Sequence, residues 1–286
     1  MKVLYILAFT NKGLRQMVWK QIPVFMRSIT LAIDQTHCEF PWRRAICRQK
    51  NICTELDIKN KKMGYYIDLQ DISIDQYKGI LKTADMIPSW RSLKKNVDEN
   101  LDLIKVQHVR NLGELQKALK NKSKIQAFSQ QSGLQEDYLV LLRRMVNGYH
   151  PKPNRIKYFP NVSEEVAGKL EEMGIKHTLS LYEKILTPEK RKELSDKTGI
   201  SKVEIVKLAR LTDLSRIRWV NHTFAYVLME AGYDTAEAVA KADYQALYET
   251  VKQLNKEREI YKANIGTNDM KLCIESARGL DFEIVY

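Results

Sequence analysis

The chain has 286 residues, which is enough for one large domain or two ordinary ones to bury a core without disulfide or metal staples. Hydrophobic residues at 44% and charged residues at 29% exclude a disordered polyelectrolyte, and 12 Gly and 7 Pro are too few for a turn-rich all-β protein. Composition therefore predicts a helical globular protein, and its net charge is +12.

Residues 1–62 differ from the rest in charge. They hold 12 Lys and Arg against 4 Asp and Glu, a surplus of +8, whereas the remaining residues hold 35 against 31. We interpret this segment as a basic N-terminal extension that is either disordered or misannotated, because Met63 offers an alternative start just before the well-patterned chain. The alternative is that this basic, apolar stretch lies on a membrane surface. Its apolar runs are far shorter than a membrane-crossing helix, so no membrane span is expected.

The cysteines indicate the redox compartment. Cys38, Cys47 and Cys53 lie in the extension and Cys273 lies near the other end, without the Cys-x-x-Cys spacing of structural zinc sites. Such usage is typical of an intracellular protein rather than of a disulfide framework, so we expect a cytoplasmic location. Neither a metal nor a cofactor is expected.

Internal similarity begins after the extension. Residues 133–147 align without gaps with residues 199–213, and residues 72–86 form a fainter earlier copy. The block 155–178 likewise parallels the block 216–235. We therefore predict an all-α protein of tandem repeats, with a first diverged helical region at 63–155 and a second region at 156–286.

Local signals agree with short helices. Thr187-Pro188 places proline at a first helical position. Gly174 and Gly232 stand where a helix would end in the left-handed conformation, and Thr178 and Thr235 are then expected to cap the helices that follow.

Two segments depart from the helical pattern. Residues 65–69 (YYIDL) and 282–286 (FEIVY) are rich in strand formers. We predict that they pair as a small two-stranded β clasp between the two ends of the helical array.

Several ordered motifs carry a family resemblance. They are Leu186-Thr187-Pro188, Arg191 to Leu194, Thr198 to Ser201, Thr212 to Leu214, Arg216-Ile217 and Ala231-Gly232. With these motifs, residues 156–280 resemble the family called domain of unknown function 4332, and residues 64–155 look like a diverged copy. The units at 156–178 and 217–235 also resemble helix-hairpin-helix motifs.

The helix-hairpin-helix resemblance implies a binding function. Related hairpins bind DNA without sequence preference, by aiming turn and helix N-terminal amides at a phosphate. This implies a non-enzymatic scaffold that binds the backbone of DNA or RNA weakly. The side chains expected to contact nucleic acid are Arg155, Lys157, Asn161, Arg216, Arg218, Asn221 and His222.

The two hairpin turns depart from that pattern. Asn161 and Asn221 stand where a second glycine is usual, and we expect them to preserve the turn because asparagine tolerates positive φ. Pro160 removes an amide donor, and the bulky Tyr158 and Trp219 would obstruct a phosphate. These departures favour the alternative function, a protein interaction or assembly module that has lost phosphate binding.

The roles of single residues in these turns also stay open. Arg216 and Arg218 are placed either to contact phosphate or to pair with a neighbouring acid such as Asp213. Trp219 is suited either to stacking on a base or to packing in a core or interface.

Catalytic motifs do not occur in the sequence. There is no Gly-x-x-x-x-Gly-Lys loop, no His-Glu-x-x-His helix and no Gly-x-Ser-x-Gly elbow, and the five histidines show no metal-ligand spacing. We therefore expect neither catalytic nor metal-binding residues. The oligomeric state is left open.

Overall fold

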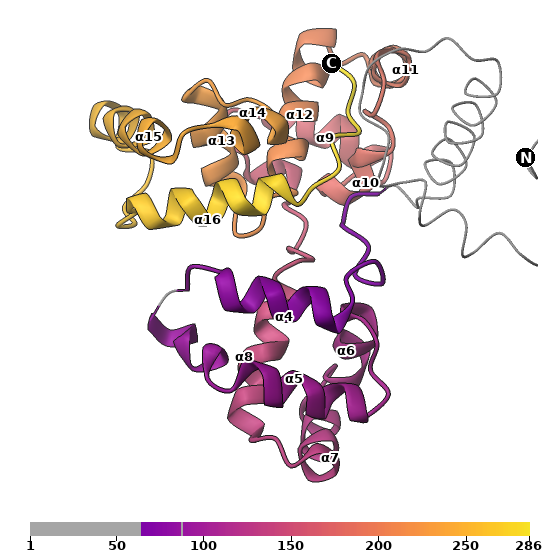
Figure 1. Ribbon diagram of the computed structural model, residues 1–286. Helices are drawn as coiled ribbons and strands as arrows, with labels where there is room; N and C mark the ends of the chain where they lie inside the picture. The colour runs from indigo at the N-terminus through magenta and orange to yellow at the C-terminus, as the bar shows by residue number, and fades with distance from the viewer. Residues whose placement is uncertain (1–63, 87) are drawn as a thin grey trace, which may run out of the picture. The chain divides into compact units, whose positions relative to one another are not determined.

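The computed structural model describes residues 64–86 and 88–286 (Figure 1). All regular elements in this part of the chain are helices and none is a strand, which confirms the predicted all-α class. The interpretations of residues 1–62 as disordered, misannotated or lying on a membrane surface concern a segment outside the described residues.

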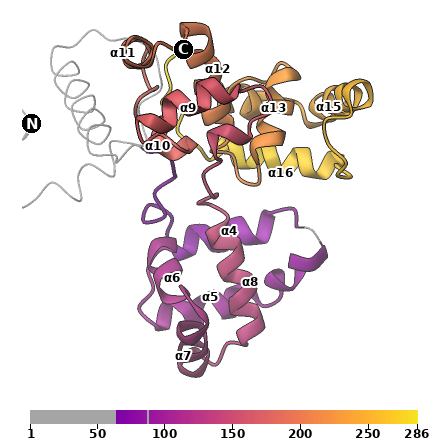
Figure 2. The same cartoon turned by 180° about the vertical axis from the view of Figure 1, so that it is seen from behind.

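The first helices form a core of their own. They are α4 (Ile74–Thr83), the 3-10 helix η3 (Pro88–Lys94), α5 (Val97–Val106), α6 (Leu112–Ala118), α7 (Lys122–Ser132) and α8 (Glu136–Asn147). Figure 2 shows these helices gathered together, and their apolar faces meet in one cluster whose buried members run from Leu69 to Val146. Tyr77 and Leu101 lie fully buried within it.

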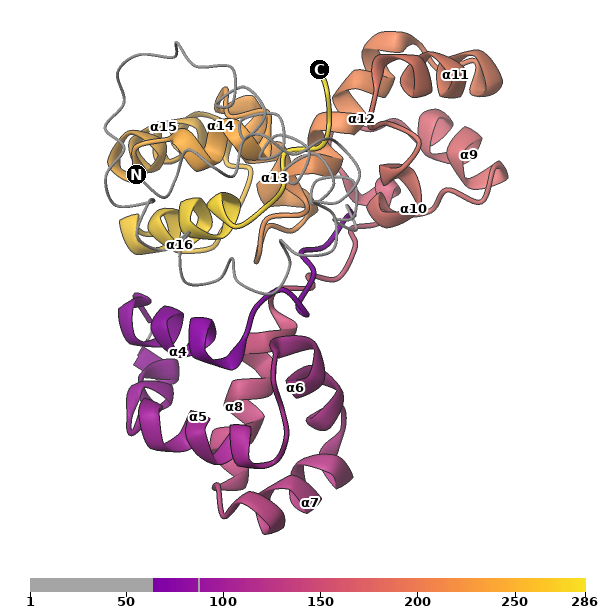
Figure 3. The ribbon, with the colours of Figure 1, turned by 45° about the vertical axis from the view of Figure 1, so that its right-hand side comes forward.

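The later helices gather around two further clusters. The elements are η4 (Ile156–Tyr158), α9 (Glu164–Glu172), α10 (Thr178–Tyr182), α11 (Pro188–Thr198), α12 (Lys202–Leu214), α13 (His222–Glu230), α14 (Ala236–Lys241), α15 (Tyr244–Arg258) and α16 (Thr267–Arg278). One cluster holds buried side chains from α9 to α12, and the other holds side chains from the end of α12 and from helices α13 to α16. Figure 3 shows α9 to α12 on one side of this region and α13 to α16 on the other. Helix α12 contributes to both clusters.

Most of the predicted caps are confirmed. Gly174 and Gly232 have φ of 76° and 86°, Pro188 is the first residue of α11, and Thr235 accepts the Ala238 N–H at the start of α14. The prediction for Thr178 is wrong by one residue, because His177 caps α10.

Thr178 is unavailable as a cap because its hydroxyl serves a tertiary contact. It lies fully buried as the first residue of α10, where its Oγ1 accepts the Asn154 N–H and shares a 2.8 Å hydrogen bond with the Tyr65 hydroxyl. His177 takes over the capping role, since its Nδ1 accepts the Ser180 N–H.

The turns that follow α7 and α11 share the same contacts. Ser129 Oγ donates to the Leu134 carbonyl at 2.5 Å, and Ser195 Oγ donates to the Ile200 carbonyl at 2.6 Å. The glycine between them, at 133 or 199, has positive φ in both turns. These turns belong to the two stretches that align in the sequence, whereas the helix-hairpin-helix description stays a prediction.

The predicted β clasp is wrong. Residues 65–69 and 282–286 contain no strand, although the two ends of the described chain are linked. The link runs through side chains: Arg216 donates to the carbonyls of Tyr65 at 3.2 Å and Asp281 at 2.7 Å. The Val285 amide instead donates to the Leu186 carbonyl, so the C-terminal segment has another partner and no ladder forms.

Candidate functional site

The first hairpin turn presents its cations to solvent. Arg155 and Lys157 flank Ile156, which is buried at 2% exposure, and both cationic side chains are exposed. Neither takes part in an ion pair with a described residue. Tyr158, with 52% of its surface exposed, lies beside them, and Lys157 Nζ is 5.8 Å from the centre of its ring.

The two turns meet at Tyr158. Its ring centroid lies 5.7 Å from that of His222, the first residue of α13, at an interplanar angle of 50°. Lys157, Tyr158 and His222 are therefore joined by contacts, and together with the exposed Arg155 of the same turn they are here called the Tyr158 surface.

The second turn buries its first arginine. Arg216 is 2% exposed and its Nη1 lies 2.9 Å from Asp213 Oδ1. Burial raises the pKa of the Asp213 carboxyl, and the Arg216 charge opposes that rise. The other Asp213 oxygen accepts the Ala236 N–H at the start of α14. Pairing with Asp213, one of the two roles left open by the sequence, is therefore the arrangement that the structure shows.

The second arginine, Arg218, is also buried. It is 7% exposed, and its Nη2 donates to the Met145 carbonyl of α8 at 2.6 Å. Its guanidinium carbon lies 4.1 Å from the ring centre of Trp219, 4.7 Å from that of Tyr149 and 5.8 Å from that of Trp90. The charge is therefore surrounded by aromatic faces, an arrangement that favours a planar guanidinium.

Room for this guanidinium comes from a glycine. A Cβ atom at Gly148 would lie within 2.9 Å of the Arg218 Cζ, closer than real side chains approach. Gly148 directly follows α8, whose last residues carry the Met145 carbonyl that accepts from Arg218. The end of α8 is thus shaped to receive the arginine.

The turn amides are largely bonded inside the protein. The Arg218 N–H donates to Ser276 Oγ at 2.9 Å, and the N–H groups of Tyr158, Phe159 and Val220 donate to nearby carbonyls. Phosphate contact through these amides would require breaking those bonds.

The residue with positive φ is not the expected one. Trp219 has φ of 68°, whereas Asn221 has φ of −84° and caps α13 by accepting the Phe224 N–H. Asn161 likewise lacks positive φ, and its Oδ1 is buried without a described partner. The expectation that the asparagines supply the left-handed residue is therefore wrong, because Asn221 serves as a helix cap in extended backbone.

The predicted nucleic-acid residues are thus split by the fold. Arg155, Lys157 and His222 lie together on the Tyr158 surface. Arg216 and Arg218 are buried, Asn221 caps α13, and the Oδ1 atom of Asn161 is buried without a described partner. Tyr158 is exposed with Arg155 and Lys157, although its size predicted that it would obstruct a phosphate.

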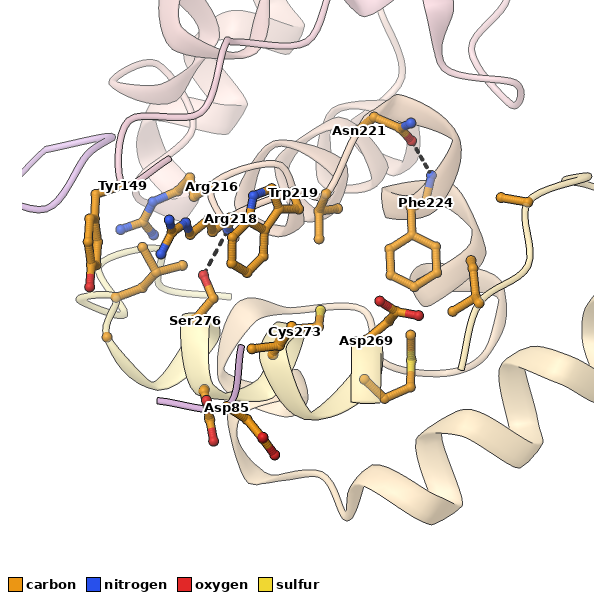
Figure 4. Close-up of a pocket in the computed structure, with 18 of the residues that line it drawn as sticks. Asp85, Tyr149, Arg216, Arg218, Trp219, Asn221, Phe224, Asp269, Cys273 and Ser276 are labelled. Carbon is orange, nitrogen blue, oxygen red and sulfur yellow. Dashed lines mark hydrogen bonds between the residues drawn. The ribbon is translucent and has the colours of Figure 1, made fainter. Parts of the chain in front are cut away.

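A cavity of about 850 Å³ lies on the other side of the second turn. Figure 4 shows the rings of Trp219 and Phe224 projecting toward α16, which carries Asp269, Cys273 and Ser276. Residues 260–265, between α15 and α16, complete that side, and Trp90 contributes from η3. No sequence motif marks these residues as neighbours, because they come together only through tertiary packing.

The described residues hold no group of three or more His, Cys, Asp or Glu side chains arranged to bind a metal ion. None of the helices at 64–86 and 88–286 combines the length and apolar character needed to cross a membrane. Cys273 lies buried, and burial raises the pKa of its thiol to about 12.

Comparison with known proteins identifies one family. Residues 160–280 match the model of the family described as domain of unknown function (DUF4332), which confirms the resemblance over that stretch. No curated protein and no solved structure matches the chain.

Proposed function

We propose that this chain, whose residues 160–280 belong to the DUF4332 family, is a non-enzymatic scaffold that binds nucleic-acid backbone weakly and without sequence preference. The observation that supports the proposal is the Tyr158 surface, where Arg155 and Lys157 are exposed without a described acidic partner and Lys157 lies beside a half-exposed aromatic ring. A cytoplasmic location, favoured by the cysteine usage, is part of the same proposal.

The chemistry of this surface suits a single strand. Unpaired cations attract phosphates, and an exposed aromatic ring offers a face on which a base of any kind stacks. The buried positions of Arg216 and Arg218 reduce the number of cations available, so the proposed binding is weak. It does not use the turn amides.

A titration of the full chain tests the proposal. Labelled single-stranded DNA, duplex DNA and RNA are titrated at about 50 mM and 200 mM salt, with the Arg155→Ala/Lys157→Ala variant beside the wild type. Because residues 1–62 carry their own surplus of +8, the difference between variant and wild type is the informative quantity. We expect the log-log salt slope of the variant to be shallower by about 2.

A matched control uses cations elsewhere. The Lys192→Ala/Lys202→Ala variant removes two exposed lysines of α11 and α12 and the same total charge. An equal loss of affinity in this control would mean that net charge alone drives binding. The proposal for the Tyr158 surface would then be abandoned.

A protein partner is the second candidate. Tyr158 and Trp219 are 52% and 47% exposed, and such aromatic side chains are enriched in protein interfaces. If no nucleic acid binds, a photo-crosslinking amino acid at position 158 should form a defined protein adduct in cells. The same amino acid at position 203, whose native valine is 78% exposed, is the control that should not.

A further inference from the structure

Trp219 occupies a backbone position that disfavours it. A bulky residue at φ of 68° is a conformational outlier, since glycine fits there without cost. Such outliers persist only where the surrounding structure over-determines them, and they cluster at functional sites. Because Trp219 is 47% exposed, burial of its ring provides only part of the stabilisation that this backbone conformation needs.

The ring of Trp219 forms a wall of the cavity of about 850 Å³. The Arg218 guanidinium, which also lines the cavity, lies over this ring with its carbon 4.1 Å from the ring centre, and the centroid of the Trp90 ring is 5.6 Å away at an interplanar angle of 49°. Phe224 and Tyr261 add two more rings to the lining. Volumes of this size and linings of this kind are typical of sites for small molecules.

The charged residues of the cavity lining fall into two groups. The carboxylates and the lysine, Asp85, Asp269, Glu275 and Lys262, are all exposed, and Asp85 is paired with Lys271 at 3.2 Å. The two arginines, Arg216 and Arg218, are buried; Arg216 is paired with Asp213, whereas Arg218 has no carboxylate partner among the described residues. Other lining residues, such as Met270, Cys273 and Val220, are buried and apolar. A positively charged ligand group would therefore lose its hydration here without a buried carboxylate to offset the loss.

Two side chains retain hydrogen-bond donors. Ser276 Oγ accepts the Arg218 N–H, and no described residue accepts its hydroxyl proton. Asn221 uses its Oδ1 to cap α13, and its amide nitrogen donates to no described residue. Both residues line the cavity, so a ligand oxygen can accept from them.

We propose that this cavity binds an aromatic small molecule that carries a hydrogen-bond acceptor and no positive charge. Its ring system packs against Trp219 and Phe224, and its acceptor lies toward Ser276 and Asn221. The site is independent of the Tyr158 surface and of any nucleic acid.

Nile red is a suitable probe for the full chain, because it is flat, uncharged, carries a carbonyl and fluoresces in apolar surroundings. We expect saturable binding, weakened by at least about tenfold in Trp219→Gly, which removes the wall while suiting the left-handed backbone. A second variant, Thr223→Trp, leaves the wall intact and adds ring volume to the lining. It should weaken binding to a similar extent.

Controls separate this site from other apolar surface. Val203→Ala changes a 78% exposed side chain away from the cavity lining and should bind the dye as the wild type does. Thermal unfolding of each variant verifies that it is folded. Absence of saturable binding, or equal binding by all variants, would overturn the proposal.

Discussion

The two hairpin turns share a sequence pattern, but the cations of one are exposed and those of the other are buried. Arg155-Ile156-Lys157-Tyr158 and Arg216-Ile217-Arg218-Trp219 each place two cations around a buried isoleucine and end in an aromatic residue. The cations of the first turn are exposed, whereas those of the second are buried at 2% and 7% exposure. The pattern alone therefore does not determine whether the charges face solvent.

The neighbours of each turn account for the difference. Asp213 precedes Arg216 by three residues at the end of α12 and provides a buried counter-charge. The segment before Arg155 is His150-Pro151-Lys152-Pro153-Asn154, which holds no acid and separates the turn from α8. Because a buried charge needs compensation, Arg216 is buried against Asp213, and Arg218 is buried among aromatic rings and the Met145 carbonyl, whereas the cations of the first turn stay at the surface.

The largest expected effect follows from removing that counter-charge. Asp213→Ala leaves Arg216 buried without its partner, and we expect a loss of about 3 to 5 kcal/mol in the free energy of unfolding. Urea denaturation measures this loss. Asp234→Ala is the matched control, because it breaks the more exposed pair with Arg210 and should cost about 1 kcal/mol or less. Similar losses in both variants would contradict the role given to burial.

Exchanging the second cation of each turn, by Arg218→Lys and Lys157→Arg, should give the next largest effect on stability. Arg218→Lys keeps the charge but loses the planar group that lies among three rings and donates to Met145, so we expect a loss of about 1 to 3 kcal/mol. Lys157→Arg changes an exposed side chain and should leave stability within about 0.5 kcal/mol. Thermal unfolding of the two variants compares them directly, and equal shifts would refute the assigned difference.

Local features of the fold were accessible from the sequence. Gly174, Gly232 and Thr235 were predicted correctly because helix ends depend on residues a few positions apart. The pairing of Arg216 with Asp213 was visible for the same reason, as one of two alternatives.

Features that depend on distant residues were not accessible. Arg218 donates to a carbonyl 73 positions away, and its space is provided by Gly148, which has no motif to mark it. The tolerance of asparagine for positive φ predicts a left-handed residue at Asn221. In the structure the left-handed residue is Trp219, whose ring packs on Arg218. The cavity joins η3, the second turn and α16, and only the folded chain brings them together.

Backbone conformation provides a finer comparison of the aromatic residues. Trp219 has positive φ, so Trp219→Gly should be more stable than Trp219→Ala by about 1 kcal/mol. Tyr158 is not among the residues with positive φ, so there the order reverses and the alanine variant should be the more stable by about 0.5 to 1 kcal/mol. Denaturant midpoints of the four variants test both signs, and the same order at both positions would contradict the assigned conformations.

The smallest effect on stability is expected at the exposed cations. Arg155→Ala should change the free energy of unfolding by no more than about 0.5 kcal/mol, because its side chain is exposed and forms no ion pair with a described residue. Arg216→Ala, at the equivalent position, removes a group that donates to two backbone carbonyls and pairs with Asp213, and should prove severely destabilising. Equilibrium unfolding of both variants measures the contrast. A costly Arg155→Ala would show that the first turn also depends on its arginine for folding, and the residue would then be a poor choice for a binding surface.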